Sequence, residues 1–145
     1  MSELYVVFTV ASADYVLPSA DVVQLESYTG ATAVPGTAAY VAGVMQVRGS
    51  VVPAVDLRAR FGLPATPNTL DTRVVVVRSG DRHVALITDS AREVVRLESE
   101  NLKPPPPIVT EQTAGLVKAV AQSGSRLFML LDFAKVIGEG TIHGR

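Results

Sequence analysis

The sequence predicts a mainly β protein: two small β-barrels packed around a shared hydrophobic core, with short capped helices. Short apolar segments are separated by glycine-containing turns at close spacing, which is typical of small antiparallel barrels. Residues 56–62 (DLRARFG) and 132–138 (DFAKVIG) also match in length, in their opening aspartate and in their closing glycine. The chain therefore repeats one plan twice, with about 60 residues in each copy, and copies this small are expected to share a core.

The first copy begins with three predicted strands and a loop. Residues 4–10 are rich in β-branched and aromatic side chains and are expected to form a hairpin with residues 15–17. A third strand is expected over residues 22–26, after a turn of helix. The glycines and the proline within residues 29–37 predict an irregular loop.

A second hairpin and a helix complete this copy. Residues 44–47 and 51–55 are the predicted strands, and the reversal at residues 48–50 contains the glycine that a tight hairpin turn favours. Asp56 is placed to cap the helix, because its carboxylate can accept from the free amides of the first turn. Gly62 is placed to end it.

The breaker-rich segment 63–71 (LPATPNTLD) marks the expected boundary between the copies. We therefore expect one domain over 1–145, with one barrel at about 4–62, a linker at 63–71 and a second barrel at about 72–138. The predicted strands of the second copy are 72–77, 83–87, 91–97, 115–121 and 126–131. The prolines at 104–107 cannot donate to a sheet, so they are expected in a connection or at an exposed edge.

Composition narrows the function. The formal net charge is −1 and the basic residues are scattered, which disfavours a nucleic-acid binder because such proteins need a cationic surface. The chain has no cysteine, so disulfides, thiolate nucleophiles and zinc knuckles are excluded. No secretory signal or membrane-spanning run is recognisable, and a cytoplasmic protein is expected.

Residues able to support catalysis are few, and we expect no enzyme, cofactor or metal. Asp56 and Asp132 are explained by helix capping. The serines at 50, 123 and 125 lie in turns that lack the strand-to-helix elbow of a nucleophile. No glycine-rich loop connects a strand to a helix as a phosphate site requires.

Two features each leave two interpretations open. Arg48, at a hairpin end, is either a solvated side chain or a donor for an interface or a backbone carbonyl. The proline run is either a rigid linker or a support that presents Ile108 and Val109 as an apolar contact.

Residues 43–63 (GVMQVRGSVVPAVDLRARFGL) closely resemble the signature of the CheW family, which reads Gly-Val, a variable residue, Asn-Leu-Arg-Gly, then an apolar strand with proline and Asp-Leu-Arg. Further family-like segments follow in order along nearly the whole chain. They are VVFTV with DYVLP, Val34-Pro35 before Tyr40-Val41, HVALITDSAREVVRL, GLVKAV and RLFMLLDFAKVI.

The resemblance implies two SH3-like five-stranded barrels and a non-catalytic adaptor that couples chemoreceptors to the histidine kinase CheA. It implies that the receptor's cytoplasmic helical tip lies in the groove between the barrels, and that the first barrel binds the regulatory domain of CheA. A further kinase contact of the second barrel would close rings in receptor arrays. The expected location is cytoplasmic, in membrane receptor arrays through partners, without direct membrane insertion or nucleic-acid binding.

The resemblance also assigns expected partner-binding residues. Val22 and Gly43 match positions linked to receptor or kinase coupling, and Arg48, followed by Gly49, matches the signature arginine important for signalling. Ile108 falls where the family often has an apolar ring-contact residue, although the loop here is shorter.

Two residues depart from the family signature. Gln46-Val47 stands where the family has Asn-Leu, which keeps an amide and an apolar group, and Gln24 stands where a glutamate is usual, which removes a charge. Gln24 and the shorter proline loop keep an alternative open. The alternative is a homologue that binds receptor without recruiting kinase, in another chemosensory pathway such as gliding motility or development. From a different class, a small barrel that binds a metabolite in its groove would require polar groups converging on a cavity.

Overall fold

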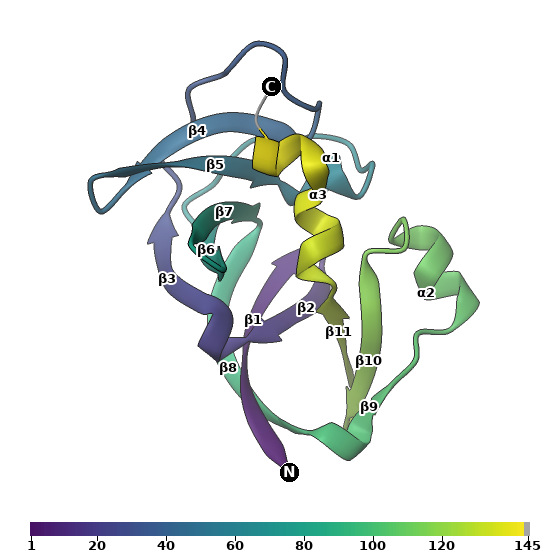
Figure 1. Ribbon diagram of the computed structural model, residues 1–145. Coiled ribbons are helices and arrows are strands. Elements are labelled where there is room, and N and C mark those ends of the chain that lie inside the picture. Colours follow the sequence, from purple (N-terminus) through teal and green to yellow (C-terminus); the bar gives the residue numbers. More distant parts are fainter. Residues whose placement is uncertain (144–145) are drawn as a thin grey trace.

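The structure, a computed structural model, describes residues 1–143 and the side chains of residues 1–138. Its strands form two sheets that pack against each other (Figure 1). The six-stranded sheet has the order β8-β1-β2-β11-β10-β9, and the five-stranded sheet has the order β3-β6-β7-β5-β4. The predicted mainly β fold class is confirmed, with one strand more than expected because the two-residue β9 joins an edge.

The elements follow the predicted order closely. The six-stranded sheet contains β1 (Ser2–Val10), β2 (Ala13–Pro18), β8 (Ser90–Glu98), β9 (Leu102–Lys103), β10 (Val117–Ser123) and β11 (Arg126–Leu131). The five-stranded sheet contains β3 (Val22–Ser27), β4 (Val41–Val47), β5 (Ser50–Asp56), β6 (Arg73–Ser79) and β7 (Arg82–Thr88). The helices are α1 (Leu57–Arg60), α2 (Pro107–Gln112) and α3 (Phe133–His143), with 3-10 turns η1 (Ser19–Asp21) and η2 (Ser99–Asn101). Within residues 1–143, no helix combines the length and the apolar character that crossing a membrane requires.

Each sheet takes strands from both copies of the sequence repeat. The hairpin β1-β2 pairs with β8 and β11, and the hairpin β6-β7 pairs with β3 and β5. The repeated plan is therefore present, but the two copies exchange their first hairpins. The sheets consist of strands within 22–88 and within 2–18 plus 90–131, so they do not follow the expected division at 63–71.

The exchange happens where the chain crosses between sheets. After Pro18 ends β2, η1 contacts both β1 and β6 and directs the chain into the five-stranded sheet. The chain returns at Asp89, which lies between the end of β7 and the start of β8. Sequence periodicity reports the order of elements, whereas these two crossings decide which strands pair.

Buried side chains form three clusters. Along β6, Val74 and Val76 belong to a core within the five-stranded sheet, whereas Val75 and Val77 join the cluster shared with the other sheet. A third cluster lies within the six-stranded sheet. Because successive strand residues point to opposite faces, a strand buried on both faces needs an uninterrupted apolar run. The predicted shared core is confirmed, and it lies between two smaller ones.

The two matching helical segments form as predicted. Asp56 accepts from the backbone N–H of Arg58 at 3.0 Å, and Asp132 accepts from that of Lys135 at 3.4 Å, so both act as N-caps. Gly138 interrupts α3 with a φ of 62°.

Hydrogen bonds from α1 and from Tyr40, which precedes β4, hold the first segment of α3 in place. Arg60 of α1 donates Nε–H to Val136 O at 2.8 Å and a terminal N–H to Lys135 O at 2.7 Å. The Tyr40 hydroxyl donates to Ile137 O at 3.3 Å. Carbonyls at a helix end lack partners within the helix, so these donors stabilise the first segment of α3.

The proline run explains why β9 is so short. Lys103 and Leu102 pair with Val120 and Ala121 of β10, and the next residues, 104–106, are prolines that cannot continue the ladder. The chain leaves β10 there, as expected of a connection (Figure 1). Sequence reasoning missed that Pro107 begins α2, a position where proline is favoured because its N–H is not needed.

Candidate functional site

The tip of the β4-β5 hairpin carries two of the predicted partner-binding residues. Arg48 and Gly49 form the two-residue turn between paired Val47 and Ser50. Their φ angles are 52° and 82°, so both adopt the left-handed conformation of a type I′ turn. Glycine adopts this left-handed conformation without steric strain, whereas arginine adopts it with a loss of conformational free energy.

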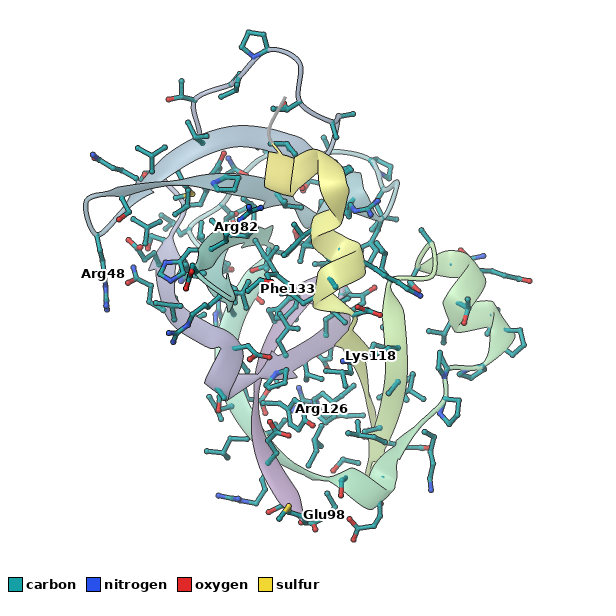
Figure 2. The ribbon with its side chains drawn as sticks, viewed as in Figure 1. Arg48, Arg82, Glu98, Lys118, Arg126 and Phe133 are labelled. Atoms are coloured by element: carbon teal, nitrogen blue, oxygen red, sulfur yellow. The ribbon has the colours of Figure 1, made fainter. Side chains whose placement is uncertain are left out.

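The Arg48 side chain is free for a partner. It is exposed, and Figure 2 shows it projecting from the end of the hairpin. Arg58 and Arg126 form ion pairs with carboxylates, whereas Arg48 forms none with the part of the chain whose side chains are described. An unpaired guanidinium in an unfavourable backbone conformation fits a recognition role.

An apolar surface continues from this tip along the five-stranded sheet. Val51 is 67% exposed. Beside it lies a shallow cavity of about 360 Å³, lined by the start of β5, by Asp81 of the β6-β7 turn and by the start of β7. Arg82 and His83 border the same cavity. The hairpin therefore carries an exposed valine near its tip, in a cavity that Arg82 also lines, and such a mixture is common in protein interfaces.

Gly43 lies where a direct partner contact is unavailable. It is buried, with a φ of 145°, beneath the loop that precedes β4. Thr32 and Val44 exchange two backbone hydrogen bonds of 2.8 Å, and a Cβ on Gly43 would overlap the Thr32 carbonyl. The position of Gly43 therefore allows residues 31–33 to pack over β4, and a role of Gly43 in partner binding stays a prediction.

Val22 and its strand lie at the other edge of the five-stranded sheet. Val22 is half-buried directly after η1 and packs on the shared core. Two positions along, Gln24 donates to Glu26, and its own oxygen is buried without a partner among the described residues. Leu25 is 41% exposed on the same strand. This edge offers apolar side chains next to the crossing between the sheets.

Ile108 lies on the other half of the molecule, in α2. Its side chain is 66% exposed, whereas Val109 packs on the shared core. Of the two residues proposed as an apolar contact, only Ile108 is therefore available as a prominent one. The prolines lead from β9 into α2, as a rigid connection would, and a contact role for Ile108 stays a prediction.

An apolar groove of about 300 Å³ separates α2 from the rest of the protein. Tyr15 and Phe61, whose rings stack with centroids 5.0 Å apart, contribute to its lining. Burial raises the pKa of the Tyr15 hydroxyl, so this phenol stays neutral at ordinary pH. The other lining residues are Val10, Ala11, Ala13, Leu63, Ile108, Val109, Gln112, Thr113 and Met129.

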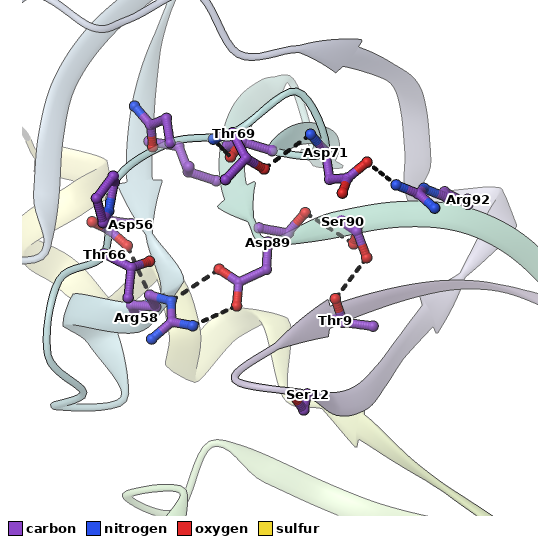
Figure 3. A pocket seen from close by; sticks show the side chains of 15 residues that line it. Thr9, Ser12, Asp56, Arg58, Thr66, Thr69, Asp71, Asp89, Ser90 and Arg92 are labelled. Carbon is purple, nitrogen blue, oxygen red and sulfur yellow. Dashed lines mark hydrogen bonds and ion pairs between the residues drawn. The ribbon is translucent and has the colours of Figure 1, made fainter.

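A polar cavity of about 600 Å³ lies between the 63–71 loop and the β7-β8 corner (Figure 3). Its two arginines are already paired: Arg58 with Asp89 at 2.7 Å, and Arg92 with Asp71. Burial raises the pKa of Asp89, but hydrogen bonds from Arg58 and from the Ala11 N–H outweigh this and lower it below its usual range. Among the described residues, no group of three or more His, Cys, Asp or Glu could hold a metal.

The predicted partner-binding residues occupy three separate surfaces. Arg48 and Gly49 share the hairpin end, Val22 lies on the opposite edge strand, and Ile108 lies on α2. Sequence reasoning missed α2, the groove beside it and the Arg58–Asp89 pair. The Asp-Leu-Arg sequence could have suggested a paired arginine, but its partner is 31 residues away. The arrangement defines a small β scaffold that offers several contact surfaces to other macromolecules.

Comparisons with known proteins agree with this class. The model of the CheW-like domain matches residues 4–140. The chain is 30% identical to chemotaxis protein CheW of Bacillus subtilis over 93% of its length and 86% of that protein's. It is 29% identical to CheW of Helicobacter pylori, covering 92% and 80%. The crystal structure of the scaffolding protein CheW of Thermoanaerobacter tengcongensis superposes with a TM-score of 0.86 at 27% identity, covering 97% and 96% of the two chains.

The chain belongs to the CheW family and is a non-catalytic scaffold protein of chemotaxis. This agrees with the predicted absence of catalysis and with the resemblance seen in the sequence. The fold match also confirms the implied architecture of two SH3-like units.

Proposed function

We propose that this protein couples chemoreceptors to the histidine kinase CheA in bacterial chemosensory signalling. The main support is the β4-β5 hairpin end. Arg48 has an exposed, unpaired guanidinium and an unfavourable φ of 52°, and it lies at the signature position of the family. A scaffold needs such a preorganised donor, because little further ordering is then required on binding.

Each surface has a proposed partner. The hairpin end, with Arg48, Gly49 and Val51, contacts the regulatory domain of the kinase. The edge strand β3, with Val22 beside the crossing between the sheets, contacts the helical tip of the receptor. Ile108 of α2 makes the second kinase contact that closes a ring. The three surfaces lie on different elements, which supports the binding of more than one partner by one molecule.

Reconstitution tests this function. Receptor cytoplasmic fragments, CheA and this protein are mixed on vesicles, and kinase activity and co-sedimentation are measured. We expect kinase activation that depends on the amount of this protein and saturates near stoichiometric addition. Binding to neither partner would refute the proposal.

A second candidate rests on Gln24. The usual glutamate is absent, and the Gln24 amide oxygen is buried without a partner among residues 1–138. This candidate is a homologue that binds receptor but does not recruit kinase, in an alternative chemosensory pathway. Separate pull-downs with receptor tip and kinase distinguish the two, since binding to the receptor alone supports the second.

A further inference from the structure

The β1-β2 hairpin ends in a turn that its own sequence does not favour. Val10 pairs with Ala13, so Ala11 and Ser12 form a two-residue turn. Their φ angles are 52° and 68°, which places both in the left-handed region. Such turns prefer asparagine and glycine, because other residues are strained there. An interaction from outside the hairpin is therefore needed to favour this conformation.

Asp89 supplies that interaction. Its Oδ2 accepts from the Ala11 backbone N–H at 2.8 Å, and its own N–H donates to Thr9 O at 2.9 Å. The next residue reinforces the contact, because the hydroxyls of Thr9 and Ser90 lie 2.6 Å apart. Figure 3 shows Asp89 and Ser90 facing the β1-β2 hairpin. Asp89 thus holds the β1 side of the turn, at Thr9 and at Ala11.

The same carboxylate also fixes α1. Arg58 donates Nε–H to Asp89 Oδ1 at 2.9 Å and a terminal N–H to Oδ2 at 2.7 Å, which is a bidentate pair. The pair is largely protected, with the two side chains 20% and 32% exposed. One residue at the crossing between the sheets therefore holds a helix of one half and a turn of the other.

The held turn and the segment that directly follows α1 line the apolar groove beside α2. The turn contributes Ala11 and its neighbours Val10 and Ala13, and the segment after Arg58 contributes Phe61 and Leu63. Asp89 itself lies in the polar cavity on the other side of these elements. It can therefore set the position of the groove's walls without touching an occupant of the groove.

We propose that Asp89 is a positioning residue: it holds the β1-β2 turn and α1, and through α1 the segment 61–63 that follows it, and so shapes the groove beside α2 and the contact surface around Ile108. The importance of that surface for signalling rests on the proposed function. The positioning itself does not, so the two are tested separately.

The first experiment measures the positioning in the isolated protein. Asp89→Asn removes the charge at constant size, and Asp71→Asn is the matched control, because Asp71 pairs with Arg92 in the same cavity at an exposed site. We expect amide exchange of Ala11 to rise at least tenfold and the methyl signals of Val10 and Met129 to shift in Asp89→Asn only. An Ala11 amide as protected as in the wild type, or equal changes in both variants, overturns the proposal.

A second substitution tests whether Asp89→Asn acts through strain in the β1-β2 turn or through a general loss of structure. Ser12→Gly relaxes the turn and lies on the polar-cavity side, away from the groove. In the Asp89→Asn background it should restore the Val10 methyl signal, although the Ala11 amide still lacks its acceptor, while Ser12→Gly alone should change neither groove methyl. Failure of the rescue in a folded double variant overturns the turn-holding role.

The final experiment connects the groove with function. We expect Asp89→Asn to reduce ring assembly with kinase at least tenfold, while binding of the isolated regulatory domain at the Arg48 hairpin changes less than threefold. Equal losses at both surfaces would overturn the specific effect on the groove. If the wild-type protein binds no kinase, the proposed function fails, and the exchange experiment still decides the role of Asp89.

Discussion

The two copies of the repeat share a hairpin, a single strand, a second hairpin and a capped helix in that order, but their hairpins end in different turns. In the second copy, Gly80 and Gly124 take the left-handed position at the first turn residue, with φ of 62° and 61°. In the first copy, Ala11 and Arg48 take it, with φ of 52° for both. Glycine adopts this conformation at no steric cost, whereas alanine and arginine do not.

The two strained turns differ in their support. The Ala11 amide is held by Asp89, which explains the conformation by a contact inside the protein. Arg48 has no comparable side-chain support within residues 1–138, only a glycine beside it. A costly conformation at an exposed tip is more readily explained by function than by folding. The comparison distinguishes a turn held by a contact inside the protein from an unsupported turn for which partner binding is proposed.

The largest expected effect is a loss of stability when the first residue of a capped helix is truncated, and it should differ between α1 and α3. Leu57 follows the Asp56 cap and is fully buried, whereas its counterpart Phe133 is half-buried. Leu57→Ala is therefore expected to destabilise by about 2–5 kcal/mol, and Phe133→Ala by less, because it leaves a smaller buried cavity. Urea unfolding of both variants measures the difference. A larger loss for Phe133→Ala would contradict the burial seen here.

Alanine substitutions at Gly43 and Gly49 compare two causes of destabilisation, a steric clash and a strained backbone φ angle. In Gly43→Ala the new methyl group overlaps the Thr32 carbonyl. The free energy of unfolding should therefore fall by about 3 kcal/mol, and the Thr32 and Val44 amides should exchange faster. In Gly49→Ala the new methyl group has no neighbouring atom. The free energy of unfolding should fall by only about 1 kcal/mol, because alanine is strained at a φ of 82°. Denaturant midpoints rank the two variants. Similar losses would show that the loop yields easily to a methyl group.

Charge reversal tests the unsupported turn. Arg48→Glu should leave stability within about 0.5 kcal/mol, because the side chain is exposed and unpaired. Binding of the kinase regulatory domain should fall at least tenfold, or about 1.4 kcal/mol, because the donor becomes an acceptor. Arg78→Glu, also exposed and in a neighbouring hairpin, is the control. Kinase activation by folded Arg48→Glu at the wild-type level would remove Arg48 from the interface.

Acidification tests the supported turn. The pKa of Asp89 is lowered in the folded protein, so its contribution to stability is present above the unfolded carboxyl pKa of about 3.9 and is lost as pH falls through the folded value. Wild type should therefore lose more stability than Asp89→Asn between neutral pH and pH of about 3. Thermal melts across this range measure it. Parallel pH profiles would show that the Asp89 charge contributes little.

The smallest expected effect concerns turn strain alone. Asparagine tolerates the left-handed conformation better than arginine, so Arg48→Asn should raise stability by about 0.5 kcal/mol while kinase binding falls. Chemical denaturation together with the binding assay gives both numbers. A variant that is more stable and binds equally well would show that the arginine is not kept for recognition.

Much of this protein follows from local sequence signals. Asp56, Gly62, Asp132 and Gly138 marked the helix boundaries, because capping and left-handed termination depend on neighbouring residues alone. The burial of the valine run in β6 on both of its faces was likewise implied by its uninterrupted apolar sequence. Arg48 was correctly expected at a hairpin end, and its role in coupling stays a prediction.

The tertiary structure decided what depends on distant residues. The exchange of hairpins between sheets, the pairing of Arg58 with Asp89 and the burial of Gly43 under Thr32 join segments whose separation in sequence carries no signal. Pattern and propensity specify which elements form, because they act over a few residues. Which edge each strand meets is decided by how the whole chain buries its apolar surface, and that is why the sheets, the groove and its support appear only in the folded molecule.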